Sequence, residues 1–308
     1  MRSLAAVLVF AVLPALEASS AQPKGGIAVF STGVEVVKVT VSVEDQARKN
    51  VRDLTVQDFV LREDNRPQKI QVFGRAFDPG EDENLALDLA ILFDTSESMI
   101  TVLKLSQQAA TRFLESIPRA RDLLVVFFDQ DLRISRYQSE RQQGLFNQIL
   151  STESGGNTAL RDAIAACLSR LSGSRGRHAM VLFTDGEDTF SRIGPDALTR
   201  LVRSSSVLIY PIALPGQTRN KDSAMQARAF LNQLADLTGG RVFTPNGAGD
   251  LPGVYQTILN DLEGQYVLGY VPENAIQDGK YRKIKIEVNR KGVKIRHREG
   301  YYAPSASR

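Results

Sequence analysis

The pattern of hydrophobic positions changes twice along the chain and divides it into three parts. In the first part, residues 37–43 place a valine at every second position between polar side chains. In the last part, residues 284–288 alternate in the same way, and residues 289–292 are typical of a turn before the alternation resumes. Alternation with a period of two predicts strands that bury one face and expose the other.

The middle part has a different pattern, in which continuous apolar runs alternate with stretches of helical spacing. The apolar runs cover residues 89–93, 123–128, 180–183 and 207–214. The helically spaced stretches cover residues 102–117, 159–171, 195–202 and 224–237. Continuous apolar runs suit strands that are covered on both faces, and their alternation with helices predicts a mostly parallel sheet wrapped by helices.

These patterns predict an α/β fold with a doubly wound, mostly parallel sheet in residues 85–263. Residues 26–80 form the expected N-terminal β segment, and residues 264–304 form the C-terminal one. Neither β segment is long enough to fold alone comfortably. We therefore expect the two segments to pack together as one small β-sandwich with the α/β domain inserted between them.

The N-terminus has the features of a secretory signal peptide over residues 1–21. Arg2 precedes an apolar run at residues 4–16, and the small residues Ser19, Ser20 and Ala21 follow. This order predicts export to the periplasm or beyond. The run is short for a bilayer span, and no later apolar stretch is longer, so no transmembrane helix is expected in the mature chain. An uncleaved membrane anchor is the alternative.

Composition adds few constraints. The chain has 308 residues and a net charge of +3, which gives no reason to expect nucleic acid as a partner. Cys167 is the single cysteine, so no intramolecular disulfide can form, and its apolar surroundings predict a buried thiol. The last segment carries a basic cluster that we expect to be a solvated strand face rather than a polyanion site. Its members are Lys280, Arg282, Lys283, Lys285, Arg290, Lys291, Lys294, Arg296 and Arg298.

Oxygen-bearing side chains stand where predicted strands of the middle part end. Asp94 ends one apolar run and is followed at alternate positions by Ser96 and Ser98, while Asp185 follows another run. Thr158 lies in a glycine-rich turn that leads into a helix. Open α/β sheets bind ligands at the carboxyl ends of their strands, so these side chains can converge there. Carboxylates and hydroxyls are hard oxygen ligands that suit Mg²⁺ or Ca²⁺.

The order Asp94-x-Ser96-x-Ser98, then Thr158, then Asp185 resembles the metal-ion-dependent adhesion site of the von Willebrand factor type A domain. The resemblance implies one bound Mg²⁺, with Ca²⁺ or Mn²⁺ as alternatives, and a protein partner that offers an acidic side chain to the ion. Many family members have glycine between the two serines, where this chain has a glutamate at position 97. The flanks, at residues 54–70, 265–270 and 300–304, resemble an exported subfamily that is abundant in Acidobacteria.

Catalysis has less support than binding. A serine nucleophile needs a histidine base, and His178 is expected at the start of a strand, opposite the strand ends that carry Ser96 and Ser98. The predicted function is therefore a non-enzymatic binding module in adhesion or envelope assembly. A hydrolase that uses the ion with Glu97 or Glu187 as base stays open, as does a metal-free structural component of the envelope. Asp94 and Asp185 as simple helix caps are the plainest alternative.

Overall fold

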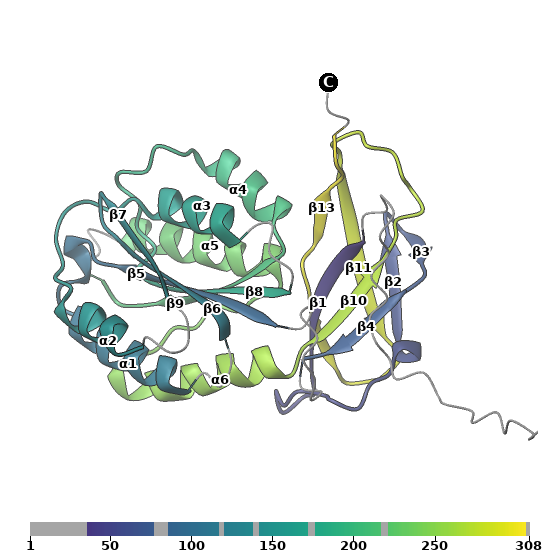
Figure 1. Ribbon diagram of the computed structural model, residues 1–308, viewed down its shortest axis with the longest axis horizontal. Helices are drawn as coiled ribbons and strands as arrows, with labels where there is room; N and C mark the ends of the chain where they lie inside the picture. Colours follow the sequence, from purple (N-terminus) through teal and green to yellow (C-terminus); the bar gives the residue numbers. More distant parts are fainter. Residues whose placement is uncertain are drawn as a thin grey trace, which may run out of the picture.

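The computed structural model consists of an α/β unit beside a β-sandwich (Figure 1). It describes residues 36–76, 86–116, 120–137, 142–171, 176–216 and 221–305. The predicted signal peptide at residues 1–21 lies outside the described residues. Among the described helices, none has the length and apolar character needed to cross a membrane.

The α/β unit is built on a five-stranded sheet in the order β7-β6-β5-β8-β9. Its strands are β5 (Leu87–Asp94), β6 (Ala120–Phe128), β7 (Leu132–Tyr137), β8 (Arg177–Thr184) and β9 (Val207–Ala213). β5, β6, β8 and β9 are parallel, and β7 pairs with β6 in the antiparallel direction. The doubly wound, mostly parallel sheet expected from the apolar runs is thus confirmed.

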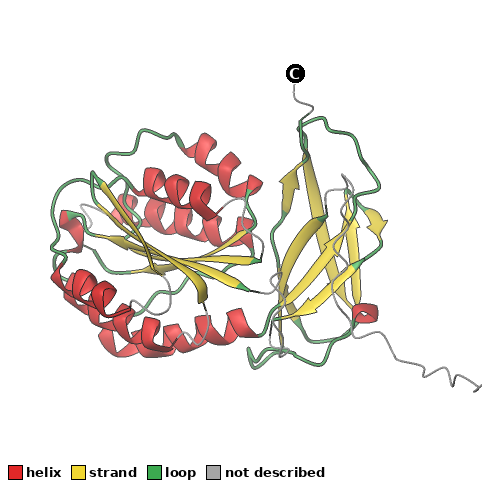
Figure 2. Cartoon of the chain, viewed as in Figure 1, coloured by secondary structure: helices red, strands yellow, loops and turns green. Residues whose placement is uncertain are grey.

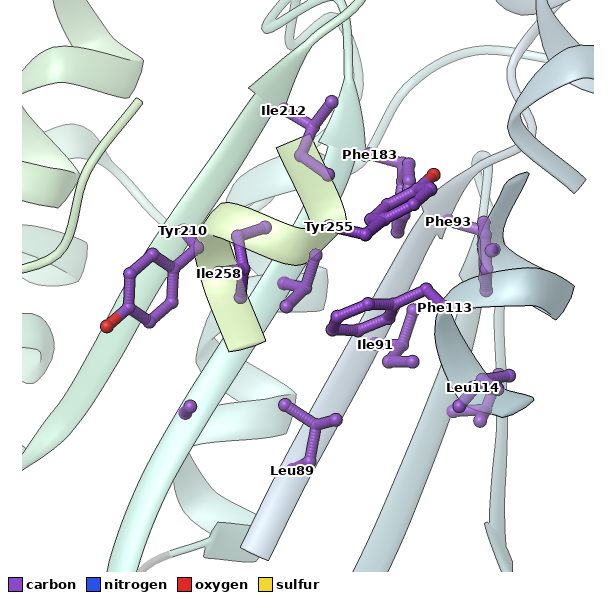
Figure 3. Close-up of a cluster of buried hydrophobic side chains, with 14 of the residues drawn as sticks. Leu89, Ile91, Phe93, Phe113, Leu114, Phe183, Tyr210, Ile212, Tyr255 and Ile258 are labelled. Atoms are coloured by element: carbon purple, nitrogen blue, oxygen red, sulfur yellow. The ribbon is translucent and has the colours of Figure 1, made fainter. Parts of the chain in front are cut away.

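Helices cover both faces of this sheet (Figure 2). One face carries α1 (Leu103–Ser116), α2 (Gln142–Ser151) and α6 (Leu251–Glu263), and the other carries α3 (Leu160–Leu171), α4 (Pro195–Ser204) and α5 (Lys221–Thr238). Alternate residues of β5 point to opposite faces, so Phe93 packs toward α1 and α6. Its ring stacks on Phe183 with centroids 4.9 Å apart, beside Phe113 and Tyr255 (Figure 3). Cys167 is buried on the other face, as predicted.

Strands from both ends of the chain build the β-sandwich. One sheet has the order β12-β1-β10-β4, and the other has the order β13-β11-β2-β3. The strands are β1 (Val37–Glu44), β2 (Phe59–Glu63), β3 (Arg66–Gln68), β4 (Val72–Arg75), β10 (Tyr266–Tyr270), β11 (Tyr281–Val288), β12 (Lys294–Arg296) and β13 (Gly300–Tyr302). Short 3₁₀ helices lie at Val56–Asp58, Glu97–Met99 and Ala248–Asp250. Since β1 pairs with β10 and β2 with β11, the expected pairing of the two terminal segments is confirmed.

A network of buried charges joins the two units. Arg296 of β12 donates hydrogen bonds to Glu44 of β1 at 3.0 Å and to Asp261 of α6 at 2.6 Å. Arg241 also pairs with Glu44, and the Tyr210 hydroxyl of β9 donates to Asp261 at 2.8 Å. The side chains of Glu44 and Asp261 are only 5% and 3% exposed, so these contacts exclude water and hold α6 against the sandwich.

The predicted solvated basic face is correct for the lysines and wrong for three arginines. Lys283 and Lys285 are exposed on β11, whereas Arg282, which precedes them on the same strand, is buried and pairs with a carboxylate at 2.8 Å. Arg296 and Arg298 are largely covered, because their long side chains extend to the α/β unit and donate hydrogen bonds to its carbonyl groups. A guanidinium group carries several N–H donors in fixed directions. It can therefore satisfy such acceptors better than the flexible ammonium group of a lysine can.

Candidate functional site

The candidate site lies where the order of the parallel strands reverses. From β5 the chain continues to β6 on one side and later enters β8 on the other side. Loops at the carboxyl ends of β5 and β8 therefore diverge, and this is the position at which open α/β sheets bind ligands. Arg177 at the opposite end of β8 donates to the Leu262 carbonyl at 2.6 Å, close to the start of β10. The carboxyl ends of these strands consequently face away from the β-sandwich (Figure 1).

Asp94 ends β5 and is 1% exposed. The Ser96 backbone N–H and hydroxyl donate to its Oδ1 at 3.0 and 2.5 Å. The Ser96 Oγ lies 3.2 Å from the Ser98 Oγ. Octahedral Mg²⁺ with bonds of 2.0–2.1 Å has adjacent ligands about 3.0 Å apart. The two serine oxygens thus have a separation that one ion can accommodate.

Thr184 belongs to this site although the sequence pattern did not assign it. It ends β8, and its hydroxyl donates to Asp94 Oδ2 at 2.6 Å while accepting from the Gly186 N–H at 3.0 Å. The hydroxyl therefore fixes the orientation of the carboxylate from the neighbouring strand. The sequence shows only that a polar residue, Thr184, stands between an apolar run and Asp185. Threonine is also common in strands without any functional role, so this feature did not distinguish Thr184 as a site residue.

The loop that contains Thr158 is tied to the other two loops by backbone hydrogen bonds. On one side the Gly155 N–H donates to the Thr95 carbonyl at 2.8 Å. On the other side the Thr158 carbonyl accepts from the N–H groups of Thr189 and Phe190 at 2.9 Å each. The side chain of Thr158 is buried at this junction, with the residue 3% exposed. The structure thus brings the three predicted segments together at one edge of the sheet.

Asp185 contributes a carboxylate with unused bonding capacity. Its Oδ1 accepts from the Glu187 N–H at 3.0 Å, while its Oδ2 is buried and has no hydrogen-bond partner among the described residues. A Cβ atom on Gly216 would overlap this carboxylate, so Gly216 is needed to leave room for it. Glu187 Oε1 is likewise buried without a partner. Buried carboxylate oxygens without donors are unfavourable unless a cation or water compensates them.

The electrostatics of the site also favour a cation. Burial raises the pKa of Asp94 to about 7, hydrogen bonds from Ser96 and Thr184 oppose the rise, and the charge of Asp185 adds to it. Two carboxylates and several hydroxyls fit a hard divalent ion, which favours oxygen ligands and retains water. Among the described residues, no group of three His, Cys, Asp or Glu side chains is arranged to hold a metal ion. The hydroxyl groups would therefore have to supply part of the coordination.

Two features concern the chemistry that the site can perform. Glu97 is exposed, so the residue that replaces glycine between the serines points toward solvent rather than into the buried carboxylate pair. His178 stands at the amino end of β8, roughly 20 Å from Asp185 at the usual rise of an extended strand. His297 lies in the β-sandwich, where its Nε2 accepts from the Ile286 N–H at 3.3 Å. Neither histidine can act as a base for Ser96.

The fold and the site define a Rossmann-like domain with carboxylate and hydroxyl side chains at the switch point of its sheet. The sequence profile of the von Willebrand factor type A domain matches residues 88–257. The chain therefore belongs to the von Willebrand factor type A family. No curated protein matched the sequence.

Solved structures with a similar fold come from several bacteria. An aerotolerance-related membrane protein from Bacteroides fragilis NCTC 9343 is 15% identical, with a TM-score of 0.46, and the match covers 57% of this chain and 98% of that one. A von Willebrand factor type A protein from Catenulispora acidiphila is 12% identical, with a TM-score of 0.48, and the match covers 90% and 76%. The pilus adhesin SpaC from Lactobacillus rhamnosus GG is 10% identical, with a TM-score of 0.48, over 80% and 48%.

Proposed function

We propose that this protein holds one divalent cation, preferably Mg²⁺, in a metal-ion-dependent adhesion site and binds a protein partner through it. The ligands would be Asp94, Ser96, Ser98, Thr158 and Asp185. The observation that carries the proposal is the buried Asp185 Oδ2, which lacks any donor among the described residues and lies beside a second buried carboxylate. A cation would compensate both charges.

The ion would supply a coordination position for the partner. Mg²⁺ prefers six oxygens and keeps waters where the protein offers fewer. A carboxylate of the partner can displace such a water and bind the ion directly. The side chains of this chain would fix the ion, while the backbone bonds between the three loops keep those side chains in place.

Placement of the site supports a role in adhesion or envelope assembly. The site lies at the edge of the sheet away from the β-sandwich, so the sandwich does not stand between the site and a partner (Figure 1). The features of residues 1–21 favour export of the protein, and the flanks resemble the exported subfamily described above. We therefore place the protein in the periplasm or outside the cell.

Metal-dependent hydrolysis is the second candidate, because Glu187 Oε1 is buried and unpartnered two residues after Asp185. A carboxylate there could act as a general base toward a water on the ion. Metal-dependent turnover of an ester or phosphoester that is lost in Glu187→Gln would favour this candidate. A purified protein without bound or bindable metal would instead favour a structural envelope component.

The decisive experiment measures cation binding and partner capture together. Mg²⁺ is titrated into purified protein by calorimetry, and partners are captured from envelope extract with Mg²⁺ or with EDTA. The variants are Asp94→Ala and, as an exposed carboxylate control, Asp222→Ala. We expect binding of one Mg²⁺ per chain and Mg²⁺-dependent capture in the wild type and the control, and neither in Asp94→Ala. Capture that persists in Asp94→Ala would refute the proposal.

A further inference from the structure

A hollow lies at the junction of the two units, at the end of the sheet opposite Asp94. It has a volume of about 1010 Å³, which is the size of a pocket for a small or medium ligand. The ends of α4 and α5 form one wall, and β11, β12 and the residues before β13 form the other. α4, α5, β11 and β13 can be followed around the junction in Figure 1. We call this hollow the junction cleft.

Cations without carboxylate partners line the junction cleft from both walls. Lys283 and Lys294 are exposed on the sandwich side, and Arg203 comes from the last turn of α4. The Arg203 guanidinium lies over the ring of Tyr281, 5.1 Å from its centroid. Among the described residues, none of these three cations forms an ion pair. Their charge is therefore available to a ligand.

Other basic residues at the junction already have structural partners. Arg296 donates to the carbonyl groups of Gly239 and Gly240 at 3.2 Å each, directly after α5. Arg298 donates to the Ser205 carbonyl, directly after α4, at 3.5 Å. The partial negative charge at both helix ends is thus covered by arginines. The C-terminal ends of α4 and α5 would otherwise repel an anion in the cleft, and the two arginines weaken that repulsion.

Two polar atoms in the cleft wall have no partner. The Nε of Arg203 and the hydroxyl of Tyr281 are buried, and neither forms a hydrogen bond within the described chain. Because nearly all buried polar groups in proteins are paired, such atoms indicate where a ligand or water supplies the missing bond. Both atoms belong to the side chains that stack at the cleft.

Carboxylates in the same walls limit the class of ligand. Asp64, Asp236 and Glu299 line the cleft together with the cations. A polyphosphate offers only negative charge and no hydrogen-bond donors, so these carboxylates would repel it. A sugar acid offers an oxyanion to the cations and hydroxyl donors to the carboxylates. We propose that the junction cleft binds an acidic oligosaccharide through Arg203, Lys283 and Lys294.

The test is a calorimetric titration with an oligogalacturonide in EDTA, which keeps the result independent of any metal site. A neutral maltooligosaccharide of the same length and a polyphosphate are the comparison ligands. The main variant is Lys283→Ala/Lys294→Ala, since both side chains are exposed and their loss should leave the fold intact. Lys69→Ala/Lys291→Ala removes two exposed lysines of the sandwich that do not line the cleft.

We expect the oligogalacturonide to bind the wild type and the control double variant, and the main variant to bind at least about tenfold more weakly, as lost charge-assisted contacts imply. Arg203→Ala should weaken binding similarly, with near-ultraviolet circular dichroism checking that the aromatic environment of the fold is kept. Absence of binding to the wild type, equal binding by the main variant, or tighter binding of polyphosphate would each overturn the proposal.

Discussion

Replacing Asp94 by asparagine should stabilise the metal-free protein. The same change should make the stability of the protein independent of Mg²⁺. Burial raises the pKa of Asp94 from 3.8 to about 7, a difference that corresponds to about 4 kcal/mol of unfavourable ionisation. The amide would keep the shape of the side chain, but Thr184 would lose its acceptor, which costs about 1–3 kcal/mol. The net gain expected for Asp94→Asn at pH 8 in EDTA is therefore about 1–3 kcal/mol.

The pH dependence of this effect has a definite sign. Because the pKa of Asp94 is higher in the folded state, the folded protein binds more protons than the unfolded chain between pH 3.8 and about 7. The free energy of unfolding of the metal-free wild type should thus fall as the pH rises through this window. The advantage of Asp94→Asn should be largest above pH 7. Toward pH 4 the variant should become less stable than the wild type, because the ionisation cost is then gone and only the lost Thr184 hydrogen bond remains.

Urea unfolding in EDTA and in Mg²⁺ measures both parts of this prediction. At a Mg²⁺ concentration of about 100 times its dissociation constant, the wild type should gain about 2.7 kcal/mol, and Asp94→Asn should gain nothing. Mg²⁺ should therefore reduce the stability difference between Asp94→Asn and the wild type, or reverse its sign. Asp222→Asn, at an exposed position, should behave as the wild type does. A less stable Asp94→Asn in EDTA, or the same gain from Mg²⁺ in both proteins, would refute the reasoning.

Two further predictions concern the room beside the site and the junction. Gly216→Ala should displace the Asp185 carboxylate and lower the affinity for Mg²⁺, measured by calorimetry, by at least about tenfold. Gly253→Ala is the control, because a Cβ at that position meets nothing within 4 Å, and it should leave the affinity unchanged. Asp261→Ala should lower the free energy of unfolding by about 3 kcal/mol in urea, because it leaves a buried arginine short of its partner. Arg290→Ala, at an exposed ion pair, should have a much smaller effect.

The four parallel strands of the central sheet could be predicted because they are continuous apolar runs, but the antiparallel strand β7 could not. β7, Leu132–Tyr137, lies at one edge of the sheet, and most of its residues are half-buried or exposed, so its apolar pattern is weak. α6, Leu251–Glu263, was not predicted as a helix because Pro252 and Gly253 interrupt the pattern at its start. Proline is compatible with the first turn of a helix, where its missing N–H leaves no bond unmade.

The candidate site could be predicted further than its supporting contacts. Asp94, Ser96 and Ser98 are close in sequence, so strand-end placement alone brings them together. The hydrogen bond from Thr184 spans 90 residues, and the bond from Arg296 to Glu44 spans 252. No local pattern encodes such pairings, since they depend on strand order and on how the two units meet.

The junction explains how the β-sandwich can hold the α/β unit, and with it the candidate site, in a fixed direction. Buried ion pairs stabilise a fold little in net terms, because desolvation offsets most of their attraction. A wrong partner would, however, leave charges of Glu44, Asp261 or Arg296 buried and uncompensated, so other arrangements of α6 against the sandwich are disfavoured. The Tyr210 bond to Asp261 extends this constraint into β9 of the central sheet. The network therefore contributes mainly to the orientation of the two units relative to each other.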